Sequence, residues 1–484
     1  MLPFAPFRYV DSGLSPKESF LGLYNPPDTS AKTLTVAIED TLIRHHLSLD
    51  KLRGQCYDGA ANMSGRHQGV QQQIAEKQPR ATYVHCCNHA LDLVLQEVSR
   101  ECPLIFDCLS LVRDVVNVIN ESPKRQGIFM RHCDQTEKPV KLKALCPTRW
   151  CVRASAMARV LKHYDAILNT LQELQGGSSL TPDMRSKVNG CVRSLKIFDI
   201  CYGIHLCYEI FAPAEAVASS LQAQGMTISE AIDGIHHLRT VLQKKRDLNF
   251  VSTYNTAFEM ARRLNLDKPK PPRLVKPPKR LEYTPSPTVD TPLSPEDHLR
   301  RLSFSVVDLV DAELARRFSS PGLKQLANLE GLLLFQVSSQ RKVEQKLGEH
   351  LLDLDATKLY VELSVLQALF KEDQRPTNTL ELAKIVVKNG RAVQVMLPEV
   401  IKACSLFLCI PATASSAERS FSTLKLLKTC LRNSMSQQRL THLMVCKVHA
   451  ETLKGEAIES IAEEFIGRVA DRSRVFGSPL SRRM

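Results

Sequence analysis

The sequence lacks a long apolar run. Its longest apolar segment, Ala403–Ile410, is far shorter than the ~20 residues that a helix needs to cross a bilayer. The first thirteen residues, MLPFAPFRYVDSG, do not combine a cationic start with a long apolar core, which is the pattern of a secretory signal. We therefore expect neither a membrane segment nor an export signal.

Cys-x-x-Cys is also absent, although the chain of 484 residues contains 15 cysteines. The missing motif argues against the usual zinc-finger and redox sites. An odd number of cysteines in a long chain without an export signal argues against a disulfide framework. We expect mostly buried, reduced thiols, as in the cytosol or the nucleus.

The composition excludes collagen-like, mucin-like and wholly disordered chains, because 43% of the residues are hydrophobic and 24% are charged. The length suggests two to four structural units. Lys and Arg number 64 against 51 Asp and Glu, which gives a net charge of +13. This excess is compatible with a nucleic-acid partner, but it is equally common in basic proteins that bind none.

The first hundred residues are predicted to be α/β. Two short strands, Pro6–Val10 and Ser19–Tyr24, flank the turn signal Asp11-Ser12-Gly13 and predict a hairpin. Apolar periodicity then predicts a helix at 31–49, a strand at 52–57, a helix at about 68–77, a strand at 82–85 and a helix at 88–98.

Residues from 149 to about 266 are predicted to be almost entirely helical, with a helical period that runs through Val192–Phe198. A proline-rich segment follows at 267–295 and predicts a flexible or polyproline-II linker. Its stretch Lys268–Arg280 holds six basic residues and no acidic one, and is either a phosphate-binding or localisation segment or a solvated linker. Further helices are predicted at 295–318, 323–337, 356–371, 380–388, 397–408, 415–427 and 437–451.

Asp58 and Glu418 are the candidate acidic residues. Asp58 follows a short strand and precedes small residues, so it could bind a hard cation such as Mg²⁺, or simply form an Asp-Gly turn. Glu418 falls in the first turn of a predicted helix that Ser415 or Ser416 would cap. From local sequence alone, that position is explained by capping and the helix dipole.

Two further motifs contain candidate ligands or stacking residues. The segment His85–His89 (HCCNH) resembles a zinc site, but consecutive strand residues face opposite ways, so at most Cys86 and His89 could converge. Arg149 precedes the single tryptophan, Trp150. An exposed Trp150 could stack on a nucleobase, whereas a buried one would anchor a core.

Four motifs occur in a fixed order along the chain. They are Cys56–Gly65 (CYDGAANMSG), Cys86–His89 (CCNH), Arg149–Trp150 and Pro411–Ser422 (PATASSAERSFS). This series resembles the hAT superfamily of DNA transposases over roughly residues 7–450. The nearest likeness is to their domesticated animal relatives, the zinc finger MYM-type protein 1-like and THAP-type repressor group.

The resemblance implies an α/β plus all-α architecture, in which a large helical insertion interrupts a truncated RNase H-like fold. In active members two Asp and one Glu hold two divalent cations, Mg²⁺ or Mn²⁺, that act on phosphodiester bonds. By motif, Asp58 matches the second Asp and Glu418 the final Glu. Cys86 and His89 match the C/D-x-x-H motif near the active site. Trp150, beside Arg149, matches a tryptophan that stacks on a flipped base.

One departure from the family pattern bears on activity. The family's first Asp lies on the first strand, whereas this chain begins at what matches the second strand, Phe7–Val10, and Asp11 lies in the turn after it. We therefore expect the first metal ligand to be missing, catalysis to be lost and no cofactor to be required. The alternatives are a residual metal-dependent transposase or nuclease that uses Asp58 and Glu418, and a non-functional fragment of a mobile element.

The C-terminal helices carry apolar stripes that are either an internal core or a dimer interface. The resemblance favours the interface, and the candidate residues are Leu406, Phe407, Ile410, Phe421, Leu424, Leu440, Leu443 and Met444. We expect a homodimer, with DNA as a possible nonspecific partner and protein partners unknown. The expected location is the nucleus, with the cytoplasm as the alternative.

Together, composition and resemblance predict six divisions of the chain. These are a partial RNase H-like domain at 1–148, a helical insertion at 149–266 and 296–379, the linker at 267–295, a dimerisation region at 380–453 that completes the fold, and a basic tail at 454–484.

Overall fold

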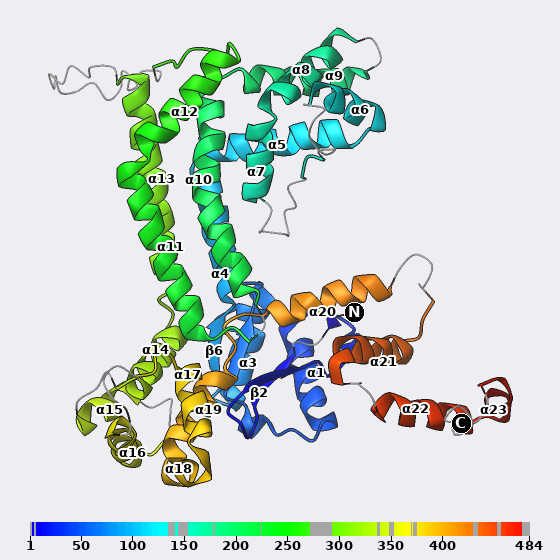
Figure 1. The fold of residues 1–484 in the computed structure, drawn as a ribbon, viewed down its shortest axis with the longest axis vertical. Coiled ribbons are helices and arrows are strands. Elements are labelled where there is room, and N and C mark those ends of the chain that lie inside the picture. Colours follow the sequence, from blue (N-terminus) through cyan, green and yellow to red (C-terminus); the bar gives the residue numbers. More distant parts are fainter. Residues whose placement is uncertain are drawn as a thin grey trace. The chain divides into compact units, whose positions relative to one another are not determined.

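The computed structural model describes most of the chain (Figure 1). The described residues are 2–3, 6–133, 141–143, 153–177, 180–223, 225–271, 293–335, 339–347, 353–368, 370, 375–428, 434–452 and 456–476. The chain divides into two compact units. Unit 1 comprises Met1–Val84 and Asn328–Met484, and unit 2 comprises His85–Ala327.

The described strands form three separate two-stranded sheets. β1 (Leu2–Pro3) pairs with β4 (Leu23–Tyr24), and β2 (Phe7–Val10) pairs with β3 (Pro16–Ser19), both antiparallel. β5 (Gly54–Tyr57) pairs with β6 (Thr82–His85). The described residues therefore supply strand pairs rather than one continuous sheet.

The predicted N-terminal hairpin is present, but its second strand differs from the prediction. Asp11 Oδ1 accepts hydrogen bonds from the backbone N–H of Gly13 (3.0 Å) and Ser15 (2.9 Å), and this turn starts the returning strand β3 at Pro16. The prediction of one strand over 19–24 is wrong. Instead, Phe20 and Leu23 are buried in an apolar cluster with Leu440 and Met444 of the C-terminal part of the chain.

Helices make up the rest of unit 1. Those before the boundary at residue 84 are α1 (Ala31–Arg44), α2 (Ala61–Ser64) and α3 (Val70–Lys77). Those after it are α15 (Gln340–Leu347), α16 (Ala356–Ala368), α17 (Thr379–Lys388), α18 (Gly390–Met396), α19 (Pro398–Cys409), α20 (Ser415–Leu427), α21 (Gln437–Val448), α22 (Glu456–Gly467) and α23 (Ala470–Phe476). Ser30 caps α1 by accepting a hydrogen bond from Thr33 N.

Unit 2 is helical. Its helices are α4 (Cys87–Glu101), α5 (Pro103–Asn120), α6 (Pro123–His132), α7 (Arg153–Lys162), α8 (Tyr164–Gly176), α9 (Pro182–Leu195), α10 (Phe198–Leu221), α11 (Ile228–Leu248), α12 (Phe250–Arg263) and α13 (Pro295–Arg317), and α14 (Pro321–Leu333) crosses the boundary between the units. The long helices α10, α11 and α13 pack side by side (Figure 1).

Helix α10 organises the core of unit 2. It packs against α4, α5, α7, α11 and α12, and thirteen of its residues are buried. An aromatic cluster joins its N-terminal turns to α12, with the Phe198 and Tyr202 rings within 5.6–6.2 Å of the Tyr254 ring. The predicted helical run through Val192–Phe198 is broken, because Ile197 is extended and separates α9 from α10.

No single described helix is long and apolar enough to cross a membrane, although α18 and α19 together pass that test with a bend of 92° between them. The described cysteines are free thiols, as predicted, and ten of these twelve are buried. The predicted linker at 267–295 lies mostly outside the described residues.

Candidate functional site

Asp58 lies directly after β5, at the start of the turn that leads into α2. Its Oδ1 accepts a hydrogen bond from Ala60 N at 3.2 Å, so the side chain does form the predicted Asp-Gly turn. The residue is exposed. The turn and a ligand role are compatible, because the bond to Ala60 engages one of the two carboxylate oxygens.

Glu418 lies in the first turn of α20, but the predicted serine cap is wrong. The N-cap residue is Ala414, and no side chain caps the helix there. The Ser416 hydroxyl instead donates a hydrogen bond to Glu18 on β3 and accepts one from Arg419. The β2–β3 hairpin therefore binds Ser416, one of the two serines predicted to cap α20.

The structure brings Asp58 and Glu418 together within unit 1. The pKa of Glu418 is raised, first by burial of its carboxyl group and also by the Asp58 carboxylate, while the Arg419 guanidinium opposes the rise. Two acidic side chains from positions 360 residues apart thus share one electrostatic environment, as the motif comparison implies.

Two arginines converge on Glu18 of the β2–β3 hairpin. Arg8 on β2 forms an ion pair with Glu18 at 3.5 Å, and its Nε donates to the carbonyl of Leu408 at 2.9 Å. Arg419 lies 3.6 Å from the same Glu18 carboxylate. Glu18 therefore links the hairpin to the end of α19 through Arg8, and to the start of α20 through Arg419. These contacts hold the first turn of α20, which carries Glu418.

The acidic pair does not fit a two-metal centre as it stands. Two bridged cations need at least three well-placed ligands, and no group of three His, Cys, Asp or Glu side chains in the described part of the chain could hold a metal ion. The arrangement is a pair of carboxylates beside an arginine.

Cys86 and His89 lie together in unit 2, where β6 passes into α4. Cys86 is buried and occupies the N-cap position of α4, with Cys87 buried behind it. The His89 ring lies 5.6 Å from the His85 ring. Arg149 and Trp150 lie outside the described residues.

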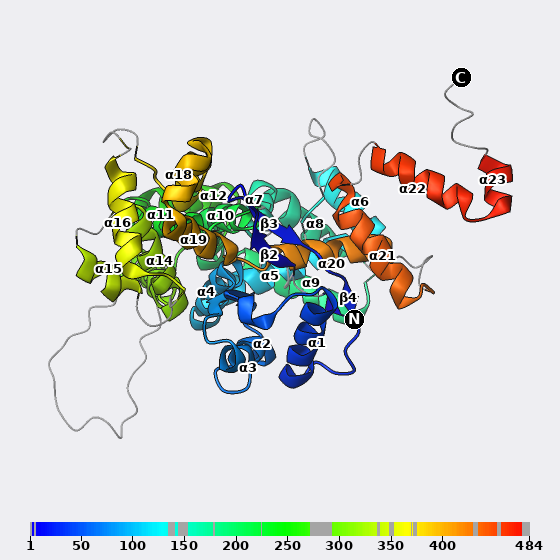
Figure 2. The same ribbon diagram turned by 90° about the horizontal axis from the view of Figure 1, so that it is seen from below.

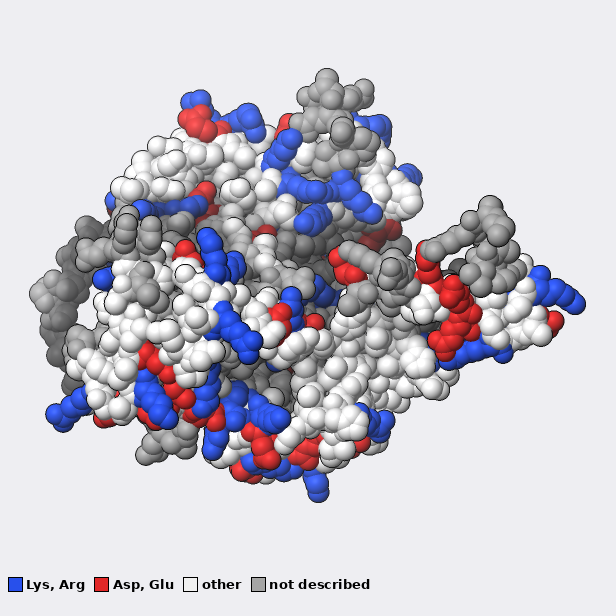
Figure 3. Space-filling model, turned by 60° about the horizontal axis from the view of Figure 1, so that its bottom comes forward, with Lys and Arg blue, Asp and Glu red and all other residues white. Residues whose placement is uncertain are grey.

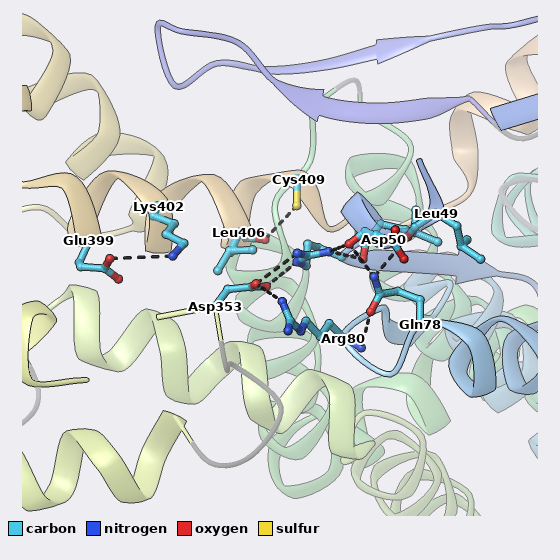
Figure 4. Close-up of polar contacts among 11 residues, drawn as sticks. Leu49, Asp50, Gln78, Arg80, Asp353, Glu399, Lys402, Leu406 and Cys409 are labelled. Carbon is cyan, nitrogen blue, oxygen red and sulfur yellow. Dashed lines mark hydrogen bonds and ion pairs between the residues drawn. The ribbon is translucent and has the colours of Figure 1, made fainter. Parts of the chain in front are cut away.

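A polar cluster at the start of β5 holds two distant parts of unit 1 together (Figure 4). Arg53 binds Asp353 through Nε and through Nη2, the latter at 3.1 Å, and Arg80 Nη1 lies 2.6 Å from the same carboxylate. Burial raises the pKa of Asp353, but the two guanidiniums outweigh this effect, so the pKa lies below its usual value. The sequence gives no signal for this clamp, because Asp353 is 300 residues from Arg53.

Close packing next to this clamp explains why position 54 is a glycine. A Cβ atom on Gly54 would lie 2.7 Å from Cγ1 of Ile410, just after α19. Only a residue without a side chain lets the chain after α19 approach β5 this closely. Gly54 therefore helps to set where α20, and with it Glu418, begins.

The residues predicted for a dimer interface differ in exposure. Phe421 is exposed, and three others are half-buried: Leu406, Leu424 and Leu443. The remaining four are buried inside the protomer: Phe407, Ile410, Leu440 and Met444. A second protomer cannot reach these four in this conformation, so they build the core of unit 1, and the dimer role of the other four stays a prediction.

Sequence comparisons match both ends of the chain. The model described as the ZMYM1/FAM200, RNase-like domain matches residues 5–69, which include β2, β3, β5 and Asp58. The model described as the hAT family C-terminal dimerisation region matches residues 368–450, which include α17 to α21 and Glu418. The second match supports a homodimer. Together the two matches support the predicted resemblance of the chain to hAT transposase-derived proteins.

Proposed function

We propose that this protein is a catalytically silent relative of hAT transposases that acts as a C-terminally dimerised scaffold in the nucleus. The observation that carries the proposal is the pairing of a recognisable dimerisation region with two carboxylates that no third metal-binding side chain completes among the described residues. Asp58 and Glu418 share one environment, but two carboxylates do not make a two-metal clamp.

The finer architecture belongs to the same proposal. We infer that residues 1–148 and 380–453 belong to a truncated RNase H-like fold, and that the helices of unit 2 from α7 onward belong to the insertion that interrupts it. The order of the chain supports this inference, because unit 1 is assembled from an N-terminal and a C-terminal segment on either side of unit 2.

A DNA cleavage assay tests directly whether the site lacks catalytic activity. The full chain is incubated with labelled duplex DNA and Mg²⁺ or Mn²⁺, beside Asp58→Asn and Glu418→Gln variants. We expect no nicking above background in any of the three proteins. Nicking by the parent chain that both substitutions abolish would refute the proposal and would support the alternative function, a residual nuclease.

That residual nuclease is the second candidate function, and one observation favours it. The raised pKa of Glu418 beside Asp58 is the kind of perturbation that functional sites produce. Asp58 and Glu418 would then be the ligands of a divalent cation, with any third ligand outside the described residues or in a partner molecule.

Binding to DNA without cleavage is compatible with the silent scaffold. Lys and Arg side chains are spread over the face shown in Figure 3, in several places beside Asp and Glu. The net charge of +13, rather than a basic patch on this face, supports contact with phosphates, which carry no sequence information. We expect any DNA affinity to be independent of sequence and to fall steeply between about 50 and about 200 mM salt.

A further inference from the structure

After Glu418, the chain contains no acidic side chain until α21 has ended. From Arg419 to Ala450 the sequence holds six Lys and Arg residues and no Asp or Glu. In the whole chain 51 of 484 residues are acidic, so a segment of this length would ordinarily include about three. Helices α20 and α21 pack against each other in unit 1 (Figure 2). Together they therefore present cations without the carboxylates that accompany them elsewhere.

Most of these cations are not used within the protomer. Arg419 lies 3.6 Å from Glu18, and Arg432 lies outside the described residues. The other four are exposed and form no ion pair with any residue that the structure describes: Lys425, Lys428, Arg439 and Lys447. We call these four residues the α20–α21 basic surface.

An apolar cluster fixes the two helices against each other. Leu440 and Met444 of α21 are buried in this cluster, and Leu424 and Leu427 of α20 pack against it. The C-terminal half of α20 is therefore held beside α21. The cations of the two helices consequently belong to one rigid pair and not to independent elements.

Local helix stability does not account for the whole surface. Lys425 and Lys447 lie in the last turns of their helices, where the helix dipole favours a cation. Arg439 lies in the first turn of α21, where the dipole disfavours a cation, and that turn has no acidic residue to balance it. The position of Arg439 is thus unfavourable for the helix alone, so an anionic partner outside the protomer explains it better than capping does.

We propose that the α20–α21 basic surface binds the phosphate backbone of duplex DNA. The proposal rests on the DNA contact proposed above and names the surface that makes it. Cations without a carboxylate partner can bind phosphates without first breaking an ion pair. Exposed polar residues of the same helices, Ser422, Gln438 and His442, can donate hydrogen bonds to phosphate oxygens. Such contacts set affinity and carry no sequence information.

Charge and burial favour DNA over two other occupants. A second copy of the chain would bring the same cations to a two-fold contact centred on this surface, and like charges would then face each other. An anionic membrane would attract the cations, but a helix that lies in a membrane also needs an open apolar face. The apolar side chains Leu440 and Met444 of α21 are buried instead.

The salt dependence of DNA binding tests the surface in the full chain. The probe is a labelled duplex of mixed sequence and about 30 base pairs, titrated between about 50 and about 200 mM salt. We expect Lys425→Gln/Lys428→Gln to reduce the slope of log Kd against log salt by about 1.8, because each phosphate contact contributes about 0.9. Over this range the affinity of the variant should fall about tenfold less than that of the parent. Lys425→Arg/Lys428→Arg keeps both charges and should bind as the parent does.

A matched control separates the surface from the net charge. Lys384 and Lys388 are exposed on α17 of the same unit, so Lys384→Gln/Lys388→Gln changes the net charge equally. We expect this control to keep the slope of the parent. Equal effects of the two double Gln variants would overturn the surface and leave the DNA contact standing. A parent chain that does not bind the duplex at about 50 mM salt would overturn the DNA contact and the surface with it. Tighter binding to phosphatidylserine vesicles than to the duplex would overturn DNA as the occupant.

Acetylation of lysines provides a second measurement on the unaltered chain. We expect bound duplex to slow the acetylation of Lys425, Lys428 and Lys447 at about 50 mM salt, and to leave Lys384 and Lys388 unchanged. Equal protection of the two sets, or protection of neither, would overturn the assignment of the surface.

Discussion

The buried ion pair between Asp92 and Arg153 predicts that unit 2 loses stability as the pH rises from 5 to 7.5. The Asp92 side chain on α4 is fully buried and lies 3.3 Å from the Arg153 guanidinium at the start of α7, which is itself 13% exposed. Burial raises the pKa of Asp92 to about 6, while Arg153 and a hydrogen bond from Gln96 lower it less than burial raises it. The ionised carboxylate is therefore disfavoured in the folded protein.

The size of the effect follows from the two pKa values. In the unfolded chain the pKa of an aspartate is about 3.9, so the folded value is about two units higher. Each unit corresponds to about 1.4 kcal/mol, which gives a total contribution of about 3 kcal/mol. This stabilisation is complete below about pH 4 and is lost as the pH rises through about 6. Between pH 5 and pH 7.5 the loss is about 1.4 kcal/mol.

Asp92→Asn removes the titration while keeping the shape of the side chain. The variant also leaves Arg153 without its anionic partner, but that cost does not change over this pH range because arginine stays charged. We therefore expect the difference in unfolding free energy between parent and variant to change by about 1.4 kcal/mol between pH 5 and pH 7.5, with the parent losing more.

The assay is urea unfolding of the full chain, followed by hydrogen exchange in peptides from α4 and α7 at both pH values. Exchange rates are corrected for their intrinsic pH dependence. Taking the difference between parent and variant at each pH cancels the contributions of the other titrating groups, which both proteins share. Equal pH dependence in parent and variant would refute the reasoning, because it would mean that Asp92 ionises as easily in the folded chain as in the unfolded one.

Two further substitutions test the packing that positions the candidate site. Gly54→Ala should destabilise unit 1 by about 1–3 kcal/mol, because its Cβ would overlap Cγ1 of Ile410. Ile410→Ala removes both Cγ atoms, so the double variant should lose less stability in urea unfolding than the sum of the two single variants. A Gly54→Ala chain as stable as the parent would contradict the contact. Asp353→Asn should cost about 2 kcal/mol, because Arg53 and Arg80 lose their shared carboxylate. The pKa of Asp353 is lowered in the folded protein. The parent should therefore be more stable than this variant above about pH 4, and the difference should disappear as the pH falls through the pKa of Asp353 in the folded protein. A stability difference that persists at lower pH would contradict the ion pair.

Local sequence predicts the elements of this fold far better than their partners. Turn residues and apolar periodicity place Phe7–Val10, Ala31–Arg44, Thr82–His85 and Ser415–Leu427 within a few residues of their observed bounds. These signals depend on neighbours along the chain. They contain nothing on the pairing of Asp353 with Arg53, because the ion pair forms only once the whole of unit 1 has assembled.

Apolar stripes show the same limit on the C-terminal helices. A stripe predicts that one face of a helix is covered, but not whether the cover is this chain or a second copy. Leu440 and Met444 are covered by Phe20 and Leu23 from the other end of the chain. Phe421 remains exposed on α20, and only the fold separates these two outcomes.

Glu418 is the residue for which local reasoning and structure differ most. A carboxylate in the first turn of a helix is normally stabilised in its charged form by the helix dipole, which lowers the pKa. In this protein the pKa of Glu418 is raised, because burial and the nearby Asp58 carboxylate outweigh the Arg419 guanidinium. Capping therefore does not account for its position. The contacts that position the start of α20 are those of Glu18 with Ser416 and Arg419, together with the close approach of Ile410 to Gly54.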